Sequence, residues 1–276
     1  MKSAILTIGD ELLGGYTLDS NGAWIGRKLM DIGIRTIWKT SMGDIKGEIV
    51  EAMALAANKA DIVICTGGLG PTRDDVTMDA YCEFTGATLE MDEDYLELLR
   101  ERFSRRGVDM PKSNLNQGHV PDRGTVIPNS KGSARGMSCT VDGTWLCILP
   151  GVPAEMKSMM EENVLPELEQ MSPSELIITN IRTTGVMESK LHDLLEPAME
   201  ESAVNIAFVP GFSGVDLRLT AGDESAVAEL ASNIYDLAGK YIYAEDWVTL
   251  EQSVGESLRE KGLMLALAES CTGGLL

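Results

Sequence analysis

The run TGGLGPTRDD at Thr66–Asp75 most constrains the fold, because it directly follows a short apolar strand, Asp61–Cys65. A strand without polar alternation is typical of a parallel sheet that is covered on both faces. The glycines of the run allow positive φ and close approach of backbone to a ligand. A helical pattern follows, so we expect free amide groups of the run at a helix N-terminus, where anions bind. The run ends in a hydroxyl, a cation and two carboxylates, a set that suits a divalent metal on a pyrophosphate.

Strand and helix patterns alternate before this run. The predicted strands are Ala4–Ile8, Ile34–Trp38 and Asp61–Cys65. The helices between them have apolar residues at helical spacing, which are Ile25, Leu29 and Ile32 in one, and Ile45, Ile49, Ala52, Met53 and Ala56 in the other. We therefore predict an α/β fold with a three-layer, doubly wound, mostly parallel sheet. In such a sheet, ligands bind at the carboxyl ends of the strands.

The chain after the glycine-rich run continues the same layer. Asp142-Gly143 separates two apolar segments and is a strong hairpin signal. Residues 107–136 have few apolar positions and predict a long functional or irregular loop. The remaining predicted elements are helices at 76–86 and 92–106, the loop at 107–136, strands Met137–Val141 and Trp145–Leu149, and a helix that begins at Pro150–Pro153.

Three domains are predicted, with boundaries at 1–172, 173–246 and 247–276, and the segment MSPSE at 171–175 marks the first boundary. The middle segment has the order strand, helix, strand, strand, helix, strand, which indicates a small α+β domain of ferredoxin or KH-like shape. It is not basic, which disfavours RNA binding. The last segment predicts a helix at 250–261, a strand at 263–268 and a glycine-containing turn at 269–274, the beginning of a truncated third module.

Composition excludes several classes of function. The formal net charge of −20 argues against broad nucleic-acid binding, which needs clustered Lys and Arg. No apolar run has the length of a membrane span, and the N-terminal residues form a strand pattern rather than a signal peptide. We therefore expect a cytoplasmic protein that binds neither nucleic acid nor membrane.

The candidate acidic residues follow the predicted strands. Asp74 and Asp75 belong to the glycine-rich run, Asp10 follows the first strand together with Glu11, and Asp44 follows the second. Parallel strands one and three can end side by side, which would bring Asp10 near Asp74. Helix capping is the alternative for each group: Thr72 and Asp75 would then mimic a capping box, and Asp44 would cap the next helix.

Two further groups carry polar side chains in glycine-containing stretches. Asn129, Lys131, Gly132 and Ser133 in the long loop suit a ribose or phosphate, although the same residue types also form turns. Ser270, Cys271 and Thr272 precede two glycines and place a hydroxyl and a thiol at an expected helix start. A nucleophile there would still need a base and an oxyanion site.

Five motifs together resemble the CinA family (competence/damage-inducible protein A), and the resemblance covers the whole chain. The motifs are TIGDELLGG at 7–15, Asp19-Ser20-Asn21, TGGLGPTRDD with Val76-Thr77, Asn129–Gly136, and LPGVPAEMKSM at 149–159. The first domain is similar to the molybdopterin-binding fold, and the middle segment to the family's KH-type domain. LALAESCTGG at 265–274 resembles the beginning of a nicotinamide-nucleotide amidase domain.

The resemblance implies hydrolysis of ADP-ribose to AMP and ribose 5-phosphate by the first domain. It implies a divalent metal ion (Mg, Mn or Co), leaves potassium open as a second ion, and implies a homodimer. By motif, a substrate cradle would comprise Thr66, Gly67, Gly68, Gly70, Thr72 and Arg73, with Asn129, Lys131, Gly132 and Ser133 from the loop. Asp10, Asp74 and Asp75 would be catalytic, and Asp44 would join them as a metal ligand.

Two departures from the family pattern bear on function. The family usually has Thr-Ala-Pro-Gly where this chain has Ser133-Ala134-Arg135-Gly136, so a rigid proline is replaced by a cation. Only Ser270, Cys271 and Thr272 represent the amidase site, so we predict no amidase activity. The alternatives to hydrolysis are a pterin-binding module and a dimeric scaffold for an amidase.

Overall fold

The computed structural model describes residues 1–171, 177–200, 202–246, 248–268 and 270–271. The chain divides into two compact units, Met1–Ser174 and Glu175–Leu276. The predicted boundary at 171–175 and the predicted first residue of the next strand, Leu176, lie almost entirely outside the described residues. No helix in the described ranges is both long and apolar enough to cross a membrane.

The first unit contains a six-stranded sheet with the order β2-β1-β3-β8-β7-β6. The strands β2, β1, β3 and β8 are parallel, while β7 is antiparallel to both β8 and β6. This confirms the mostly parallel sheet and the hairpin at Asp142-Gly143, where both residues have positive φ. The strands are β1 (Lys2–Ile8), β2 (Arg35–Met42), β3 (Ile62–Thr66), β6 (Thr125–Ile127), β7 (Gly136–Val141) and β8 (Thr144–Leu149).

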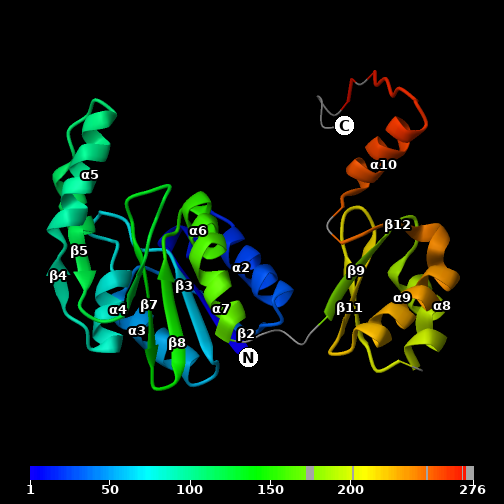
Figure 1. Ribbon diagram of the computed structural model, residues 1–276, viewed down its shortest axis with the longest axis horizontal. Helices are drawn as coiled ribbons and strands as arrows, with labels where there is room; N and C mark the ends of the chain where they lie inside the picture. The colour runs from blue at the N-terminus through cyan, green and yellow to red at the C-terminus, as the bar shows by residue number, and fades with distance from the viewer. Residues whose placement is uncertain (172–176, 201, 247, 269, 272–276) are drawn as a thin grey trace. The chain divides into compact units, whose positions relative to one another are not determined.

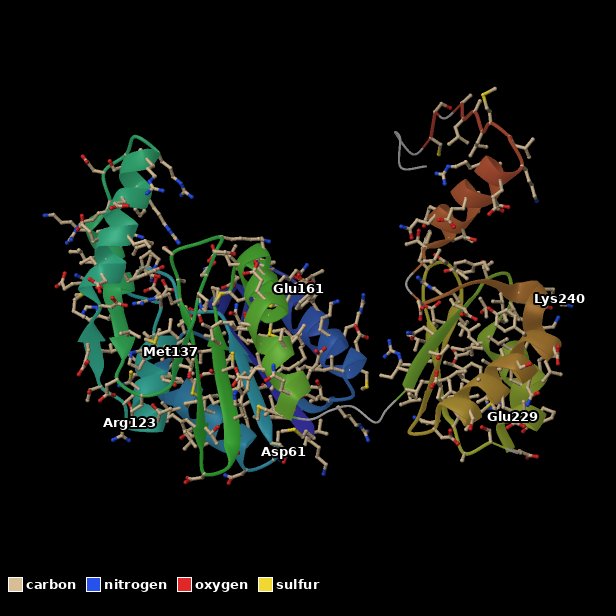
Figure 2. The ribbon with its side chains drawn as sticks, viewed as in Figure 1. Asp61, Arg123, Met137, Glu161, Glu229 and Lys240 are labelled. Atoms are coloured by element: carbon tan, nitrogen blue, oxygen red, sulfur yellow. The ribbon has the colours of Figure 1, made fainter. Side chains whose placement is uncertain are left out.

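Helices cover both faces of this sheet, so the predicted three-layer arrangement is correct (Figure 1). One face packs against α3 and α4, and the other against α2 and the α6–η2–α7 segment. Alternate residues of β1 supply the two cores, since Leu6 belongs to the first and Ile5 to the second. The side chain of Met137 on β7 is buried in the first core (Figure 2). The helices are α2 (Ser20–Asp31), α3 (Lys46–Ala57), α4 (Thr77–Thr85), α6 (Pro153–Met159), the π-helical η2 (Met160–Val164) and α7 (Leu165–Met171).

Regular structure also forms where the sequence predicted only a loop. Residues 107–136 contain a 3-10 helix and two short strands, and one of these strands pairs with β4. All of these elements are short, and β4 is exposed throughout, so none of them shows the apolar periodicity from which an element is predicted. Strands β4 and β5 lie with α5 to one side of the main sheet (Figure 1), whereas β6 is the edge strand of that sheet. The elements not yet given are α1 (Asp10–Leu13), β4 (Leu89–Met91), α5 (Glu93–Arg105), η1 (Lys112–Gly118) and β5 (His119–Pro121).

The second unit has the predicted α+β order and an antiparallel four-stranded sheet, β10-β11-β9-β12. Its core joins the sheet to two helices and includes the fully buried Leu191, Leu217 and Ile234. The elements are β9 (Ile177–Thr183), α8 (Glu188–Glu200), β10 (Asn205–Pro210), β11 (Val215–Ala221), α9 (Glu224–Ala238), η3 (Gly239–Tyr241) and β12 (Ile242–Glu245).

The C-terminal segment differs from the prediction. The helix α10 (Leu250–Glu260) begins at a capping box formed by Thr249 and Gln252, as a helix was expected there. The predicted strand at 263–268 is wrong, because these residues have no regular structure. A strand needs a neighbouring strand for its backbone hydrogen bonds, and none pairs with these residues within the described chain. Met264 is fully open to solvent at 98% exposure.

Ile64, in the middle of β3, tests how far the central strand determines stability. Its side chain is fully buried, so Ile64→Ala should lower the free energy of unfolding by about 2–5 kcal/mol. Ile37→Ala, on β2, is the matched control, since Ile37 is 42% exposed and its truncation should cost less than about 1 kcal/mol. Urea denaturation followed by circular dichroism measures both values. Equal losses in the two variants would contradict the assignment of the core.

Candidate functional site

The carboxyl ends of four strands meet at one edge of the sheet, and each leads into a loop that contains glycine. The parallel register of β2, β1, β3 and β8 places these ends side by side. The loops contain Gly9-Asp10, Gly43-Asp44, Gly67–Gly70 and Pro150-Gly151. This is the edge where ligands bind in open α/β sheets, so the predicted position of the candidate site agrees with the fold.

The glycine loop packs directly against the ends of β1 and β8. Gly67 has φ 116° and donates from its amide to the Leu149 carbonyl at 3.0 Å. A side chain at Gly67 would collide with the carbonyl oxygen of Ile8, which explains the glycine. Gly68 has φ 63°, another conformation that favours glycine. Within the described chain, neither the Gly68 nor the Gly70 amide donates to a backbone carbonyl.

The expectation that the glycine run leads straight into a helix N-terminus is wrong. The next helix, α4, begins at Thr77, after an irregular turn at residues 70–76. Its first amide is occupied, since Thr77 donates to the Gly68 carbonyl at 3.1 Å. Anion binding by this loop therefore depends on its own amides rather than on the dipole of α4.

Asp10 and Asp44 hold the loops after β1 and β2 together. The Asp10 amide donates to Asp44 Oδ2 at 3.1 Å, and the Asp44 amide donates to Asp10 Oδ1 at 3.3 Å. Asp44 therefore does not cap α3, whose first turn has no side-chain cap. Burial raises the pKa of Asp44, and the nearby carboxylates of Asp10, Glu11 and Asp75 raise it further. The sequence predicts that Asp10 lies near Asp74, whereas in the structure it is hydrogen-bonded to Asp44.

Asp75 is fixed by Thr72 within the turn that follows the glycines. The Thr72 amide and hydroxyl both donate to Asp75 Oδ2, at 2.9 and 2.6 Å. Capping of α4 by Thr72 is excluded, because the residue before that helix is Val76. Thr72 therefore orients a carboxylate in this structure. Arg73 and Asp74 are exposed in the same turn.

The buried Thr66 and the partly buried Asn21 connect the loops at the ends of β3 and β8. The Thr66 hydroxyl donates to the Pro150 carbonyl at 2.9 Å and accepts a hydrogen bond from the Asn21 amide at 3.2 Å. The same Asn21 amide group donates to the Gly151 carbonyl at 2.8 Å. Thr66 is 2% exposed, and its hydroxyl positions these loops, so its predicted role in substrate binding stays a prediction.

Asn129 organises the loop between β6 and β7. Its side-chain oxygen accepts from the amides of Lys131 and Gly132, and its amide group donates to the Ala134 carbonyl and to Glu155. Asn129 is 4% exposed and is committed to these contacts, so the turn-forming alternative is correct for this residue. Gly132 lies directly on the Glu155 carboxylate, where any side chain would collide with it. Lys131 is exposed, and Ser133 is partly buried.

Arg135, the departure from the family pattern, is buried between α5 and the glycine loop. Its guanidinium forms an ion pair with Asp92 at 2.5 Å and lies over the Tyr95 ring, 3.8 Å from the ring centroid. The Tyr95 amide and the Arg135 guanidinium hold the pKa of Asp92 below its ordinary value. The second guanidinium nitrogen, Nη2, is buried without a partner in the described part of the protein.

Two adjoining cavities surround the glycine loop. The first, of about 450 Å³, is lined by the loops at all four strand ends and includes Glu11, Asp44, Asp75, Ser133 and Glu155. The second, of about 270 Å³, shares Gly68, Gly70 and Asp75 with the first and contains Arg135. Met78, Leu89 and the polar Asn116 and His119 also line it. A ligand bound at the glycines can therefore extend in more than one direction.

The carboxylates are close to one another without forming a finished metal site. In the described residues, no group of three or more His, Cys, Asp or Glu side chains is arranged to hold a metal ion. The raised pKa of Asp44 nevertheless reports three acidic neighbours, Asp10, Glu11 and Asp75. Mg²⁺ is commonly held by one or two carboxylates together with substrate phosphates and waters. The donor set therefore fits a metal that binds together with a phosphorylated ligand.

Several residues of the site were missed or only partly recognised from the sequence. From the sequence alone, Glu11 is only the neighbour of Asp10, Asn21 is only part of a family motif, and Glu155 has no assigned role. Their position could have identified these three residues, since each follows or faces the end of a strand. Of the predicted amidase residues, Ser270 and the exposed Cys271 are described, and Thr272 lies outside the described residues.

The fold places the first unit among the molybdopterin-binding-like α/β domains. Residues 4–170 match the family model described as "Probable molybdopterin binding domain". Residues 179–244 match the "Damage-inducible protein CinA KH domain". The chain therefore belongs to the CinA family, as the sequence motifs indicated.

Named relatives agree with this assignment. A CinA-like protein of Gemmatimonas aurantiaca is 38% identical over 288 residues, covering 100% of this chain and 67% of that protein. A CinA-like protein of Chlorobium phaeobacteroides is 36% identical over 289 residues, covering 100% of this chain and 68% of that protein. The crystal structure of CinA from Thermoplasma acidophilum is similar with a TM-score of 0.54 and 33% identity, over 59% of this chain and 97% of that one.

Gly67 tests the packing of the glycine loop. Gly67→Ala should lower stability by about 2 kcal/mol or more, because it combines an unfavourable φ with a collision against the Ile8 carbonyl. Gly47→Ala is the control, since Gly47 lies in α3 with open space around it. That variant should be neutral or up to about 1 kcal/mol more stable. Thermal denaturation compares the two, and a stable Gly67→Ala would refute the close packing.

The lowered pKa of Asp92 predicts that its contribution to stability depends on pH. Its folded pKa is lowered, so its contribution is complete above the ordinary Asp value of about 3.9 and is lost as pH falls through the folded pKa. At neutral pH, Asp92→Asn should cost about 2 kcal/mol, since it removes a charged partner of buried Arg135. The loss relative to wild type should shrink in acid. Asp94→Asn, in the exposed first turn of α5, should show neither effect.

Proposed function

We propose that the first unit hydrolyses the pyrophosphate of ADP-ribose or a related nucleotide. The observation that supports this most is the glycine loop, which lines one cavity together with Asp44 and Asp75. Its Gly68 and Gly70 amides donate to no backbone carbonyl in the described chain, so they are open to phosphate oxygens. Hydrolysis also needs carboxylates next to the phosphates, and the loops after β1, β2 and β3 supply them at one sheet edge.

We assign the acidic residues to metal binding and to positioning of water. Asp44 and Asp75, assisted by Asp10 and the exposed Asp74, would hold a divalent ion, Mg²⁺, Mn²⁺ or Co²⁺, with potassium as an optional second ion. Such an ion supplies neutralisation of the pyrophosphate charge and a more acidic water. Thr72 fixes Asp75 through two hydrogen bonds, and Asp10 fixes Asp44 through its amide. These contacts keep two carboxylates in place before a ligand binds.

The remaining predicted residues differ in the role that we propose. Gly67, Gly68 and Gly70 form the cradle, while Asn129 and Gly132 shape the neighbouring loop. Ser133 and Arg73 remain proposed substrate contacts, since they are partly buried or exposed around the site. Lys131 lines a neighbouring cavity instead, so we assign it no contact with ADP-ribose. A homodimer and a cytoplasmic location remain predictions.

Binding of a pterin without hydrolysis is the second candidate function. It is favoured by the match of residues 4–170 to the family model whose description names molybdopterin binding. The same glycine loop would then hold the phosphate of the pterin. Calorimetry with a molybdopterin precursor and with ADP-ribose separates the two candidates. Binding of the precursor without turnover of ADP-ribose would favour the pterin-binding module, because only the hydrolytic function requires turnover of the nucleotide.

Hydrolysis is tested by incubating the chain with ADP-ribose and Mg²⁺, Mn²⁺ or Co²⁺ and measuring AMP by chromatography. AMP should form only with the metal. Asp44→Asn and Asp75→Asn should each lower kcat/KM by roughly 10²-fold or more, because each removes a charge that faces the pyrophosphate. The isosteric Asn retains an oxygen that can accept the bonds from Thr72 and Asp10.

Asp142→Asn provides the matched control for this experiment. Asp142→Asn makes the same change of charge at the turn between β7 and β8, at the edge of the sheet opposite the carboxyl ends of the parallel strands. Its activity should equal that of the wild type. Wild-type turnover in both Asp44→Asn and Asp75→Asn would reject the proposed reaction.

A further inference from the structure

A third cavity, of about 520 Å³, lies between the C-terminal half of α5 and the loop after Asn129. Its lining is strongly basic, with four cations and a single carboxylate, Glu155, in the described residues. Two walls are apolar, from Leu99 and Phe103, and small hydroxyls and a glycine complete the surface. The lining residues are Leu99, Arg102, Phe103, Arg105, Arg106, Ser130, Lys131, Gly132, Ser133 and Glu155.

This concentration of positive charge is opposite to the rest of the chain, which has 43 acidic and 23 basic residues. Arginines at the end of α5 are partly explained by the helix dipole, which favours cations at a C-terminus. That effect does not explain Lys131, which comes from another loop. Arg105 pairs with Glu101 at 3.2 Å. In contrast, no ion pair among the described side chains neutralises Arg106 or Lys131.

The one acidic side chain of the cavity is already engaged. Glu155 accepts a hydrogen bond from Asn129 at 2.6 Å and is covered by Gly132. Its single negative charge offsets only one of the four cations of the lining, and Glu101 pairs with a second, Arg105, so the cavity keeps a net positive charge. Like charges held close together repel one another, so a cluster of this kind is stabilised when an anion binds.

The basic cavity adjoins the proposed hydrolytic site. Ser133 and Glu155 line both this cavity and the one that contains the glycine loop. Arg102 donates to the Gly132 carbonyl at 3.2 Å, and Tyr95 donates to the Ser133 carbonyl at 2.9 Å. Helix α5 thus holds the loop that separates the two cavities, and a ligand that extends past Ser133 enters the basic one.

We propose that this cavity binds a phosphomonoester carried by the substrate in addition to its pyrophosphate. Guanidinium groups recognise phosphate through paired, charge-assisted hydrogen bonds, and a lysine adds a point charge. ADP-ribose has no phosphate beyond its pyrophosphate, so the preferred substrate would be a nucleoside diphosphate compound with an extra phosphate on one arm. This inference rests on the proposed function, since it assumes a pyrophosphate at the glycine loop.

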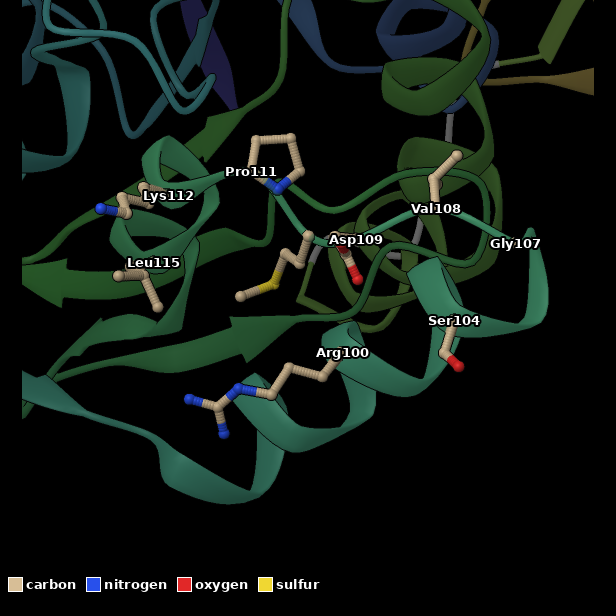
Figure 3. Close-up of a pocket in the computed structure, with 9 residues that line it drawn as sticks. Arg100, Ser104, Gly107, Val108, Asp109, Pro111, Lys112 and Leu115 are labelled. Carbon is tan, nitrogen blue, oxygen red and sulfur yellow. The ribbon is translucent and has the colours of Figure 1, made fainter.

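A neighbouring cavity offers a matched control. It has about 590 Å³ and lies between α5 and residues 107–115 (Figure 3). Arg100 and Lys112 line it together with an acidic residue, Asp109, and apolar side chains. Arg100 is ion-paired with Glu97 at 2.9 Å. Removing these two cations changes the net charge as much as removing Arg106 and Lys131.

Calorimetry at low ionic strength, without a divalent metal so that no ligand is hydrolysed, tests the proposal with three ligands: ADP-ribose, ADP-ribose 2′-phosphate and ADP-ribose 1″-phosphate. The wild type should bind at least one phosphorylated ligand about tenfold or more tightly than ADP-ribose, as expected for one charge-assisted hydrogen bond. In Arg106→Gln/Lys131→Gln this preference should disappear while ADP-ribose binding stays unchanged. Arg100→Gln/Lys112→Gln should keep the preference, and added salt should weaken it.

The outcomes separate the two proposals. Equal wild-type affinity for all three ligands, binding of none of them, or an unchanged preference in Arg106→Gln/Lys131→Gln would overturn the phosphate site. A preference that depends on Arg106 and Lys131 without release of AMP would support the phosphate site and reject only the hydrolytic reaction. Circular dichroism of both double variants checks that the exposed substitutions leave the fold intact.

Discussion

The contact between Gly67 and the neighbouring strand ends is the constraint on which the edge of the sheet depends. Its amide is bonded to the Leu149 carbonyl, and its α-carbon faces the Ile8 carbonyl so closely that no side chain fits. Gly151, after β8, approaches from the other side, where an added β-carbon would lie 3.3 Å from Gly67 Cα. Three strand ends thus meet at one residue without a side chain, and the remaining loops are positioned around it.

The regions around this edge differ in the sign of their charge. Carboxylates gather at the ends of β1, β2 and β3, and burial together with mutual repulsion raises the pKa of Asp44. On the other side of Ser133, the basic residues of α5 and Lys131 line a separate cavity. A ligand with a phosphate chain and a bound cation would match both signs of charge. The proposed binding of a metal, a pyrophosphate and an extra phosphate follows from these neighbouring acidic and basic regions, which meet at Ser133.

Sequence patterns predicted the layers well, because the uninterrupted apolar run of β3 and the helical spacing of the apolar residues in α3 reflect burial on the sheet. They failed for β4 and β5, which are three residues each and carry too little apolar surface to produce a period. Side-chain partners were harder to predict than elements. Asp44 fits a helix cap by sequence, yet its partner is an amide 34 residues away. Likewise, Arg135 pairs with Asp92 across 43 residues, a contact that no local pattern encodes.

The reciprocal bonds between Asp10 and Asp44 have a thermodynamic consequence for ligand binding. Each residue uses its amide to hold a carboxylate oxygen of the other, so two loops are ordered by the fold itself. A ligand that binds there does not have to restrict these backbones, and the conformational entropy that ordering costs is charged to folding instead. Replacing either carboxylate would therefore affect affinity twice, through the missing charge and through a looser resting state of the partner loop.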